Sequence, residues 1–252
     1  MHEYLIRRNA VFAAIDAGRR TIHKLWLQSD LNRQSVDDIL HAASEQHIVI
    51  QKASKKQLSE LAGDSRHQGV VLEVDPYAYS SVESIFALAA RRDEKPLLLL
   101  LDLLHGPQNI GSLLRTAEIC GVHGVIIQDR RAPDITPAVV QYSAGASEYL
   151  LVSQVTNLVS TIDGLKERGV WVAGLDIDEN ARAPGGIDLD LPLALIVGHE
   201  GSGLRRLVKK RCDFIVQLPM RGHTESLNAA VAGSIALYAA WQARSYEGFG
   251  AL

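Results

Sequence analysis

The sequence predicts an α/β fold, in which helices cover parallel sheets. Short apolar runs with the length and branching of buried strands alternate with segments of helical period along most of the 252 residues. Two of these runs, Leu193–Val197 and 214–218, lead directly into loops rich in glycine, proline and small polar residues. Loops at the carboxyl ends of parallel strands are where open α/β sheets bind ligands. We therefore expect the functional site in the stretch 192–232.

The first 75 residues have the pattern of a small α/β unit of their own. Helices are predicted at 4–18, 35–46 and 54–63, and strands at 22–27, 47–51 and 69–74. Gly18 and Gly63 are suited to end the first and third helices, because glycine readily adopts the left-handed conformation found there. Ser54 and Gln57 have the spacing of a capping box at the start of the third helix. We expect an independent domain at 1–75.

A second, larger domain is predicted at 96–252, after a linker at 76–95. The linker contains the turn-rich DPYAYSS, a helix capped by Ser80 and Glu83, and the charged break ARRDEKP. After Pro96, strands and helices alternate again. The strands are predicted at 97–101, 125–128, 149–152, 170–175, 193–197 and 214–218, and helices are predicted to start near Asn109, Thr136, Thr156 and Gly203, with a last one at 226–244. Continuous apolar strands indicate that helices cover both faces of this sheet.

The composition is that of an ordinary globular protein, with 47% apolar and 22% charged residues. No apolar run reaches the roughly 18 residues that a membrane span needs. The N-terminus lacks the layout of a signal peptide, and Cys120 and Cys212 can form neither a disulfide framework nor a metal-ligand cluster. We therefore expect buried free thiols, no metal, no membrane association and a cytoplasmic location.

The net charge of −3 at pH 7 is not the basic excess typical of nonspecific nucleic-acid binders. The local charge differs from the total, because basic residues gather in two clusters. These clusters are Arg7, Arg8, Arg19, Arg20 and Lys24, and Lys52, Lys55 and Lys56. A solvated face and an RNA-binding face explain each cluster equally well.

Common cofactor motifs are missing from the predicted site. Gly198, Gly201 and Gly203 form G-x-x-G-x-G, which is the dinucleotide fingerprint reversed, and they follow the wrong strand of the domain. The sequence contains no phosphate-binding G-x-x-x-x-G-K-[ST] loop and no nucleophile elbow of the serine-hydrolase kind. A standard NAD, ATP or serine-hydrolase enzyme is therefore disfavoured.

Three short motifs instead carry candidate functional residues. Asn109 is suited to cap a helix, and Arg115, one and a half turns later, is either a surface residue or a bidentate phosphate ligand. Glu200 follows a buried strand and either interacts with a helix dipole or faces the crevice, where it would orient Arg115 or a substrate hydroxyl. Ser226 and Asn228 either cap the last helix or present polar groups to a ligand at its N-terminus. Plain packing is the more ordinary explanation for Met220, which lies just before this motif.

Taken together, the motifs N-x-G-x-x-x-R-T-A, I-V-G-x-E-G-x-G-L and L-P-M-x-G-x-x-x-S-L-N resemble the SpoU/TrmH family of RNA ribose 2′-O-methyltransferases. The resemblance covers 97–240. The segments RRNAVFAAI and HQGVVLEV of the first 75 residues resemble the ends of the ribosomal-protein-like RNA-binding domain that precedes the catalytic domain in the RlmB-type branch. That branch methylates a guanosine ribose of 23S ribosomal RNA.

The resemblance implies a trefoil α/β knot (the SPOUT fold), an S-adenosylmethionine cofactor bound in the knot, and a homodimer whose site is completed across the interface. Gly198, Leu218 and Leu227 match the cofactor positions of the family, and we add the neighbouring Gly201 and Met220 to this set. The matching catalytic positions are Asn109, Arg115, Glu200, Ser226 and Asn228. Ribosomal RNA is the implied partner, with the N-terminal domain as its selector.

Two departures from the family pattern are present. His199 stands where asparagine or serine is commoner, and Ala229-Ala230 replaces Val-Ser. The family view makes Arg115 the proton acceptor, but a guanidinium is almost never neutral in a protein. We prefer the hypothesis that Arg115 holds a nucleotide phosphate and stabilises the developing alkoxide, while the proton passes to water or to Glu200.

Three alternatives stay open at this point. One is the same chemistry on transfer RNA or on another ribosomal nucleotide, since the sequence does not contain the target. Another is a noncatalytic RNA-binding or ribosome-assembly factor, which the filled catalytic positions disfavour. The third is a metabolic enzyme with a nucleotide cofactor, which the missing fingerprints disfavour.

Overall fold

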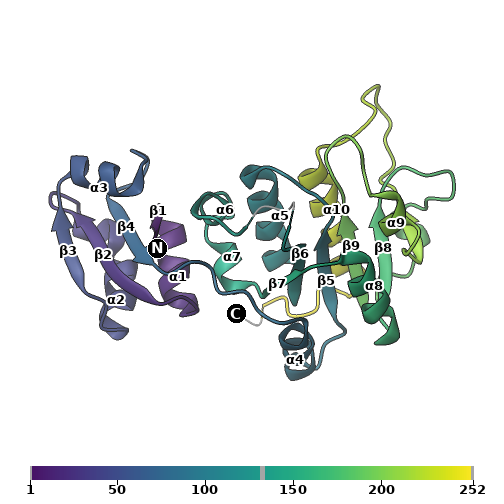
Figure 1. Ribbon diagram of the computed structural model, residues 1–252, viewed down its shortest axis with the longest axis horizontal. Helices are drawn as coiled ribbons and strands as arrows, with labels where there is room; N and C mark the ends of the chain where they lie inside the picture. The colour runs from purple at the N-terminus through teal and green to yellow at the C-terminus, as the bar shows by residue number, and fades with distance from the viewer. Residues whose placement is uncertain (1, 131–133, 251–252) are drawn as a thin grey trace. The chain divides into compact units, whose positions relative to one another are not determined.

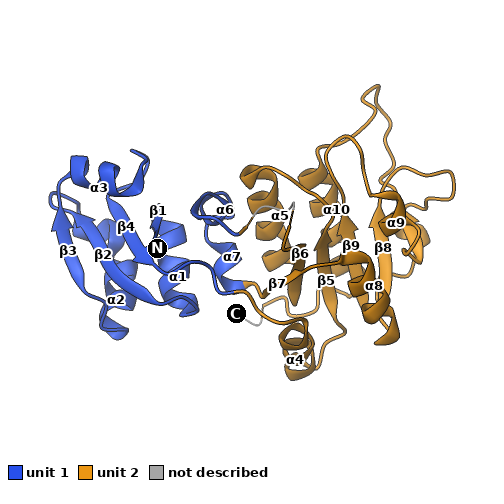
Figure 2. Cartoon of the chain, in the orientation of Figure 1, with its two compact units in different colours: residues 1–78, 135–149 blue, residues 79–134, 150–252 orange. Residues whose placement is uncertain are grey.

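The computed structural model describes residues 2–130 and 134–250, which form two compact units. Unit 1 contains residues up to 78 together with 135–149, and unit 2 contains 79–134 and 150–252 (Figure 2). Unit 1 therefore includes residues 135–149, which follow the first two strands of unit 2 in the sequence. Each unit has its own sheet and its own core.

Unit 1 is built on a four-stranded sheet in the order β1-β4-β2-β3 (Figure 1). Its elements are β1 (Glu3–Ile6), α1 (Arg8–Ala17), β2 (Ile22–Gln28), the 3-10 turn η1 (Arg33–Val36), α2 (Asp37–Glu45), β3 (Ile50–Ala53), α3 (Lys55–Ala62), β4 (Val70–Val74), α6 (Pro137–Tyr142) and α7 (Ala146–Tyr149). β4 runs antiparallel to both of its neighbours, whereas β2 and β3 are parallel. Alternate residues of a strand face opposite sides, so Ile6 and Val71 pack with Leu58 of α3, while Leu5 points to the other face.

The segment 135–149 packs on this unit through α6 and α7. α7 contacts α1, and α6 contacts β1. The approach is close at Gly145, where a Cβ atom would lie 2.5 Å from the Cβ of Ala13 and 2.8 Å from the carbonyl oxygen of Asn9. Gly145 also has a φ of 92°, which L side chains rarely adopt, so glycine is required here twice over.

Unit 2 is built on a six-stranded parallel sheet in the order β10-β8-β9-β5-β6-β7 (Figure 1). Its elements are α4 (Val82–Arg92), β5 (Leu97–Leu101), α5 (Pro107–Ile119), β6 (Gly124–Gln128), β7 (Val152–Val155), α8 (Leu158–Glu167), β8 (Trp171–Leu175), the 3-10 turn η2 (Pro184–Gly186), β9 (Leu193–Val197), α9 (Arg206–Lys209), β10 (Phe214–Val216) and α10 (Ala229–Ala243). Every residue of β5 and β9 is buried, as expected for central strands. The α/β class with a parallel sheet is confirmed.

Helices cover both faces of the parallel sheet. Side chains of α4, α8 and α9 join one core with β5, β8 and β9. On the other face α10 packs against α5 and β9, closest at Gly233, where a Cβ atom would lie 2.9 Å from both Leu113 and Val197. Thr116 and Ser234 add a hydroxyl hydrogen bond of 2.9 Å between these two helices.

The segment between β8 and β9 flanks β10. β10 pairs with β8 on one side, and on its other side the Arg182 N–H donates to the Ile215 carbonyl and the Gln217 N–H donates to the Arg182 carbonyl, both at 2.9 Å. Part of the segment 176–192 therefore lies along the free edge of β10. This arrangement is compatible with the knot that the family resemblance implies.

Several predicted elements of unit 1 were wrong in position. The predicted helix 4–18 is in fact β1 followed by α1, because residues 3–6 pair with β4 and Arg7 then turns the chain with a φ of 72°. The predicted strand 47–51 starts later, as β3, since the N–H groups of His47 and Ile48 are still bonded to carbonyls of α2. The capping box of Ser54 and Gln57 is confirmed.

Unit 2 shows similar differences at helix starts. The linker helix is capped by Ser81 rather than Ser80. The helix predicted to start near Thr156 is α8, which starts at Leu158 and is capped by Asn157. The predicted strand 149–152 is β7 at Val152–Val155, because Tyr149 still belongs to α7. The helix predicted near Gly203 starts at Arg206 as α9. The predicted bounds of β5 and β9 are confirmed.

Candidate active site

A pocket of about 530 Å³ lies at the carboxyl edge of β8, β9 and β10, beside the start of α10. Three loops and the helix start supply its lining, at 175–177, 197–203, 216–220 and 226–232. The volume is within the range of small-molecule and cofactor sites, roughly 300–1,000 Å³. The position agrees with the general rule for ligands of open α/β sheets.

Glycine forms the floor of the pocket at the end of β9. A Cβ atom at Gly198 would lie 2.5 Å from the backbone of Gly203, and one at Gly203 would lie 2.7 Å from the carboxylate of Asp176. His199 and Gly203 exchange two backbone hydrogen bonds of 3.0 and 3.1 Å, which fold the intervening residues into a tight loop. Gly201 at its tip has a φ of 91°. The pocket therefore presents backbone where side chains would fill the space.

Asp176 anchors this loop, a role that the sequence analysis missed. Its carboxylate accepts hydrogen bonds from the N–H groups of Ile177 at 2.7 Å and Leu204 at 3.3 Å, and Lys209 lies 3.2 Å away. Burial disfavours the charged form of Lys209, but the hydrogen bonds to Asp178 and Asp176 outweigh it, so its pKa is raised. The available signal was the position of Asp176, which is the first polar residue after β8.

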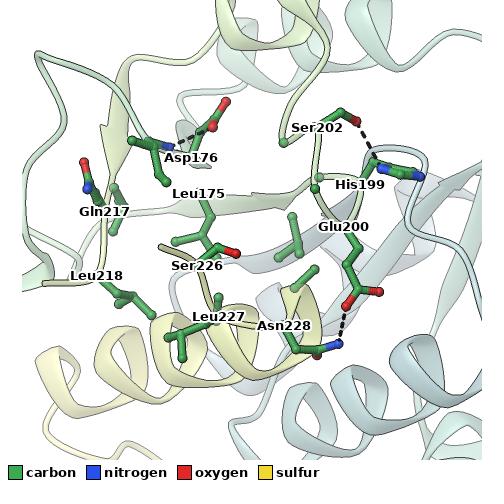
Figure 3. A pocket seen from close by; sticks show the side chains of 18 of the residues that line it. Leu175, Asp176, His199, Glu200, Ser202, Gln217, Leu218, Ser226, Leu227 and Asn228 are labelled. Carbon is green, nitrogen blue, oxygen red and sulfur yellow. Dashed lines mark hydrogen bonds between the residues drawn. The ribbon is translucent and has the colours of Figure 1, made fainter. Parts of the chain in front are cut away.

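Apolar side chains form the other wall of the pocket. Leu218, Met220 and Leu227 line it, and Figure 3 shows Leu218 and Leu227 on the side of the pocket away from Glu200. Met220 and Leu227 are about two-fifths exposed, at 41% and 42%. Ordinary core packing therefore does not explain Met220. Ser226 also lines the pocket, between these residues and Glu200 (Figure 3).

Asn109, Glu200 and Asn228 form a closed polar network at the edge of the pocket. The Glu200 carboxylate accepts hydrogen bonds from Asn109 Nδ2 at 2.9 Å and from Asn228 Nδ2 at 2.8 Å, and Asn228 Nδ2 also donates to Asn109 Oδ1 at 3.0 Å. Glu200 points toward Asn228 in Figure 3. The network joins α5, the loop after β9 and the start of α10, which are far apart in the sequence.

Asn228 fixes the orientation of this network. Its Oδ1 caps α10 by accepting hydrogen bonds from the N–H groups of Ala230 and Val231, so its amide nitrogen is left to face Glu200. The prediction that Asn109 caps α5 was wrong, because Gly106 occupies that position and Pro107 begins the helix. Asn109 lies within the first turn instead, where its amide is free to reach Glu200.

Arg115 lies outside this network. The residue is exposed on α5, and its guanidinium has neither an ion pair nor a hydrogen bond with any residue that the structure describes. The side chains at 109 and 115 are six positions apart, so they point to different sides of the helix. A single chain thus brings together Asn109, Glu200, Ser226 and Asn228 but leaves Arg115 free for other groups.

Two histidines stand beside the network, of which His105 was missed by the sequence analysis. His199 Nδ1 lies 3.0 Å from the Ser202 hydroxyl, and its ring meets that of His105 edge-on, with 5.6 Å between centroids. His105 follows β5 just as His199 follows β9. The His105 ring is exposed, and the His199 ring, which is partly buried, belongs to the residue next to Glu200.

Thiol and metal chemistry have little support at this site. Burial raises the pKa of Cys120 to about 11 and that of Cys212 to about 12, so both thiols are protonated at neutral pH. Among the described residues, one group of three potential metal ligands comes together, His2, His23 and Asp75, and none of them lines the pocket. No helix in the described part of the chain has the length and apolarity of a membrane span.

The fold and the site together define a class of protein. It is an α/β protein with a pocket of the size of a small-molecule site between glycine loops and apolar side chains, and with a carboxylate–amide network at the pocket's edge. Comparisons with known proteins narrow this class to one family.

Residues 96–238 match the SpoU rRNA Methylase family, and residues 8–80 match a domain described as RNA 2′-O ribose methyltransferase substrate binding. YacO of Bacillus subtilis, assigned to the TrmH family of tRNA/rRNA methyltransferases, is 39% identical over 249 residues, which is 98% of each chain. A Staphylococcus haemolyticus protein with the same assignment is 42% identical over 244 residues, 97% of each chain. This chain therefore belongs to the SpoU/TrmH family of RNA methyltransferases.

Solved structures support the fold. The SpoU methyltransferase AviRb from Streptomyces viridochromogenes, crystallised with the cofactor AdoMet, superimposes with a TM-score of 0.79 at 23% identity over 97% of this chain and 91% of its own. An rRNA methyltransferase from Sinorhizobium meliloti, also bound to AdoMet, has a TM-score of 0.77 at 22% identity and covers 96% of this chain and 87% of its own.

Proposed function

We propose that the protein transfers a methyl group from S-adenosylmethionine to a ribose 2′-hydroxyl in RNA, most directly a guanosine of 23S ribosomal RNA in the cytoplasm. The observation that carries this proposal is the Asn109–Glu200–Asn228 network, which places a carboxylate and two amides at the mouth of a glycine-floored pocket. Family membership supplies the reaction class, and the network supplies groups that suit a ribose hydroxyl.

The pocket suits the cofactor in shape and in chemistry. Gly198 and Gly201 leave backbone groups open to the polar parts of the ligand, and Leu218, Met220 and Leu227 offer apolar contacts to its base and methylthio carbons. S-Adenosylmethionine, when bound, supplies an activated methyl group on a sulfonium. The protein must then position the acceptor hydroxyl and help to remove its proton.

The residues of the network divide this work. Asn109 and Asn228 hold the Glu200 carboxylate by donating to both of its oxygens, so its remaining lone pairs face the ribose. Arg115 holds the nucleotide phosphate and stabilises the alkoxide as it forms, because a guanidinium stays charged and binds phosphate with two parallel hydrogen bonds. We propose that the proton of the ribose 2′-hydroxyl passes to Glu200 or to a water molecule beside it.

We further propose that the active form is a homodimer. α10 exposes an apolar stripe of Val231, Ile235 and Tyr238, at 46–47% exposure, and α5 exposes Ile119 at 54%. The spacing of the stripe is that of one helix face, and such faces are normally covered. Arg115 and Ile119 are one turn apart on α5, so a second copy that covers Ile119 also brings one protomer's Arg115 toward the other copy.

Mixed dimers test this arrangement. Arg115→Ala and Glu200→Gln each weaken both sites of a homodimer, but a mixed dimer contains one site with both residues intact if they come from different protomers. Activity of the mixture above that of the more active variant supports the shared site. A protein that sediments as a monomer, or a mixture no more active than the average of its components after subunit exchange is verified, contradicts it.

The domain assignments 1–75 for RNA selection and 96–252 for methyl transfer are part of the same proposal. The match of residues 8–80 to a substrate-binding domain supports the first. Transfer RNA is the competing substrate, since the relatives are assigned to tRNA/rRNA methyltransferases.

Calorimetric titration with S-adenosylhomocysteine, followed by tritiated methyl transfer to unmethylated ribosomal RNA in the same preparation, tests the function. Binding with transfer supports the proposal in full. If the protein binds S-adenosylhomocysteine and methylates transfer RNA but not ribosomal RNA, transfer RNA is the substrate. Absence of binding overturns the methyltransferase proposal and favours a noncatalytic RNA-binding factor.

A further inference from the structure

A basic groove of about 800 Å³ lies in unit 1, at one edge of its mixed sheet. All four strands lead to this edge: β1 ends before Arg7, β2 ends at Gln28, β3 ends before Lys55, and β4 begins after Gly69. α1 and α3 both start here, so the positive ends of two helix dipoles point to the same place. Four cationic side chains line the groove, namely Arg7, Arg8, Lys55 and Arg66.

The groove carries an excess of positive charge. None of the described residues that line it is acidic. Two carboxylates stand beside it. Asp64 pairs with Arg66 at 2.7 Å, and Asp30 accepts a hydrogen bond from Gln28 at 2.8 Å. Arg7, Arg8 and Lys55 form no ion pair with a described carboxylate, although Asp64 and Asp30 lie close enough to interact with Arg7 and Lys55 through their charges. Four cations against two carboxylates leave the groove with a net positive charge.

Arg8 is the most informative of these cations. Its Nε is buried and has no hydrogen-bond acceptor among the described residues, although its backbone N–H donates to Gln68 Oε1 at 3.1 Å. A buried donor on a charged group normally has a partner, because leaving it unpaired carries the full cost of removing that donor from water. An anion in the groove would supply that acceptor.

Arg7 is held in place next to it. With the Gln141 amide oxygen turned toward the guanidinium, Arg7 Nε and Nη2 donate to it at 2.6 and 2.9 Å. Gln141 belongs to α6, so the segment 135–149 positions a side chain of the groove. His67, also in the lining, is buried with its pKa lowered by desolvation, and it contributes no charge at neutral pH.

We propose that this groove binds backbone phosphates of the RNA substrate. The inference rests on the proposed function for the identity of the ligand. The lining contains no Phe, Tyr or Trp, and its one aromatic ring, that of His67, is only 1% exposed, so the groove offers no accessible aromatic ring on which a base would stack. Its contacts therefore fix the position and register of the RNA and do not read its sequence.

Salt-dependent RNA binding tests the assignment. The probes are two fluorescein-labelled RNA stem-loops of unrelated sequence, titrated with the full-length protein over a series of KCl concentrations. Arg8→Gln and Lys55→Gln are each expected to lower the slope of log K against log[KCl] by about 0.7–1, equally for both probes. Arg91→Gln with Arg92→Gln, which removes two exposed arginines of α4, is the matched control and should leave the slope unchanged.

The outcomes separate this inference from the proposed function. Unchanged slopes in both groove variants, or an equal change in the control, overturn the groove assignment even if the wild type methylates RNA. A loss confined to one probe overturns backbone recognition. Failure of the wild type to bind S-adenosylhomocysteine concerns the proposed function alone. Should Arg8→Gln fail to fold by circular dichroism, the exposed Lys55 decides the result.

Discussion

Two glutamates, Glu148 in unit 1 and Glu200 in unit 2, each join segments that are distant in the sequence, but their surroundings differ. Glu148 is 1% exposed and receives the Arg20 guanidinium on both oxygens at 2.9 Å. Glu200 is exposed and receives two neutral amides. The Glu148 carboxylate is buried in an ion pair with Arg20, whereas the Glu200 carboxylate contacts neutral amides and remains open to a ligand.

The rest of the Glu148 site confirms that it holds the fold together. Arg20 also donates to Glu3 at 2.8 Å and to the Asp75 carbonyl at 3.2 Å, so it ties β1, the end of β4 and α7 together. Tyr77 lies under the guanidinium and donates to the Ser147 carbonyl at 3.1 Å, and burial raises its pKa to about 12. The pKa of Arg20 itself is raised, because the hydrogen bonds and charges of Glu148 and Glu3 outweigh the desolvation that acts against it. The partners of a carboxylate, and not its residue type, therefore decide whether it stabilises the fold or remains available to a ligand.

Glu148→Ala is expected to have the largest effect on stability. Removing one partner of a buried ion pair leaves an uncompensated charge and typically costs about 3–5 kcal/mol. Denaturant unfolding followed by circular dichroism measures the change, with the exposed Glu167→Ala as the control that stays within about 0.5 kcal/mol. Replacing both partners, as Arg20→Met with Glu148→Leu, should recover much of the loss. Equal unfolding midpoints for Glu148→Ala and wild type would contradict the structural role.

Arg115→Ala should lower methyl transfer about 10²–10³-fold, the loss typical of one group that stabilises developing negative charge. Affinity for S-adenosylhomocysteine should not change, since Arg115 does not line the pocket. Steady-state transfer and calorimetry on the same sample measure both, with Arg91→Ala as the control. If cofactor binding is lost together with transfer, Arg115 is a cofactor or folding residue instead.

Glu200→Gln should reduce transfer about tenfold to a hundredfold, because it removes the charged acceptor that faces the ribose hydroxyl, and one hydrogen bond to a charged group is worth roughly 1.5–3 kcal/mol. Stability should change by no more than about 0.5 kcal/mol, in contrast to Glu148→Ala. The pH–rate profile of the variant shows whether Glu200 accepts the hydroxyl proton. If the profile is the same in Glu200→Gln and in the wild type, Glu200 is not the proton acceptor and water is favoured.

His123 adds a buried neutral group to the comparison, and its effect depends on pH. Burial, together with the charges of Arg92 and Arg244, lowers its pKa to about 4 from the ordinary 6.5, and its Nδ1 accepts a hydrogen bond from the Leu97 N–H. The unfolded chain takes up a proton below pH 6.5 that the folded protein resists, so stability should fall as the pH falls from 6.5 toward 4, by at most about 1.4 kcal/mol per pH unit.

Unfolding free energies at several pH values between 7 and 4 measure this, with His123→Gln as the variant that removes the titration. The difference between wild type and variant should shrink as the pH falls through this window. A difference that stays constant would mean that His123 titrates alike in both states.

Sequence reasoning succeeded where one local pattern dominates. β5 and β9 were placed correctly because each is a continuous apolar run that begins after a proline and ends before Asp102 or Gly198, and Thr136 with Pro137 marked the start of α6. Asn109 was misplaced as a helix cap because a long-range contact with Glu200 determines its role, while Gly106 and Pro107 carried the real start signal.

Long-range pairing explains the remaining differences. Arg20 and Glu148 are 128 positions apart, so no local pattern predicts that 135–149 packs on unit 1. The carboxyl-edge rule anticipated that Asn109, Glu200 and Asn228 gather near one pocket, since each follows or faces the end of a parallel strand. The same rule marks the position of Asp176, the first polar residue after β8, but the loop-anchoring role of this residue depends on the fold of residues 198–204.

The most direct test of ribose 2′-O-methylation is nucleoside analysis of RNA methylated by the purified protein. Unmethylated ribosomal RNA is incubated with tritiated S-adenosylmethionine, digested to nucleosides and separated by chromatography. The label is expected to elute with a 2′-O-methylnucleoside, which is 2′-O-methylguanosine if the ribosomal target is correct. The Glu200→Gln variant is expected to form the same product more slowly. Label on a base, or equal labelling by wild type and the Arg115→Ala variant, would contradict the proposed function.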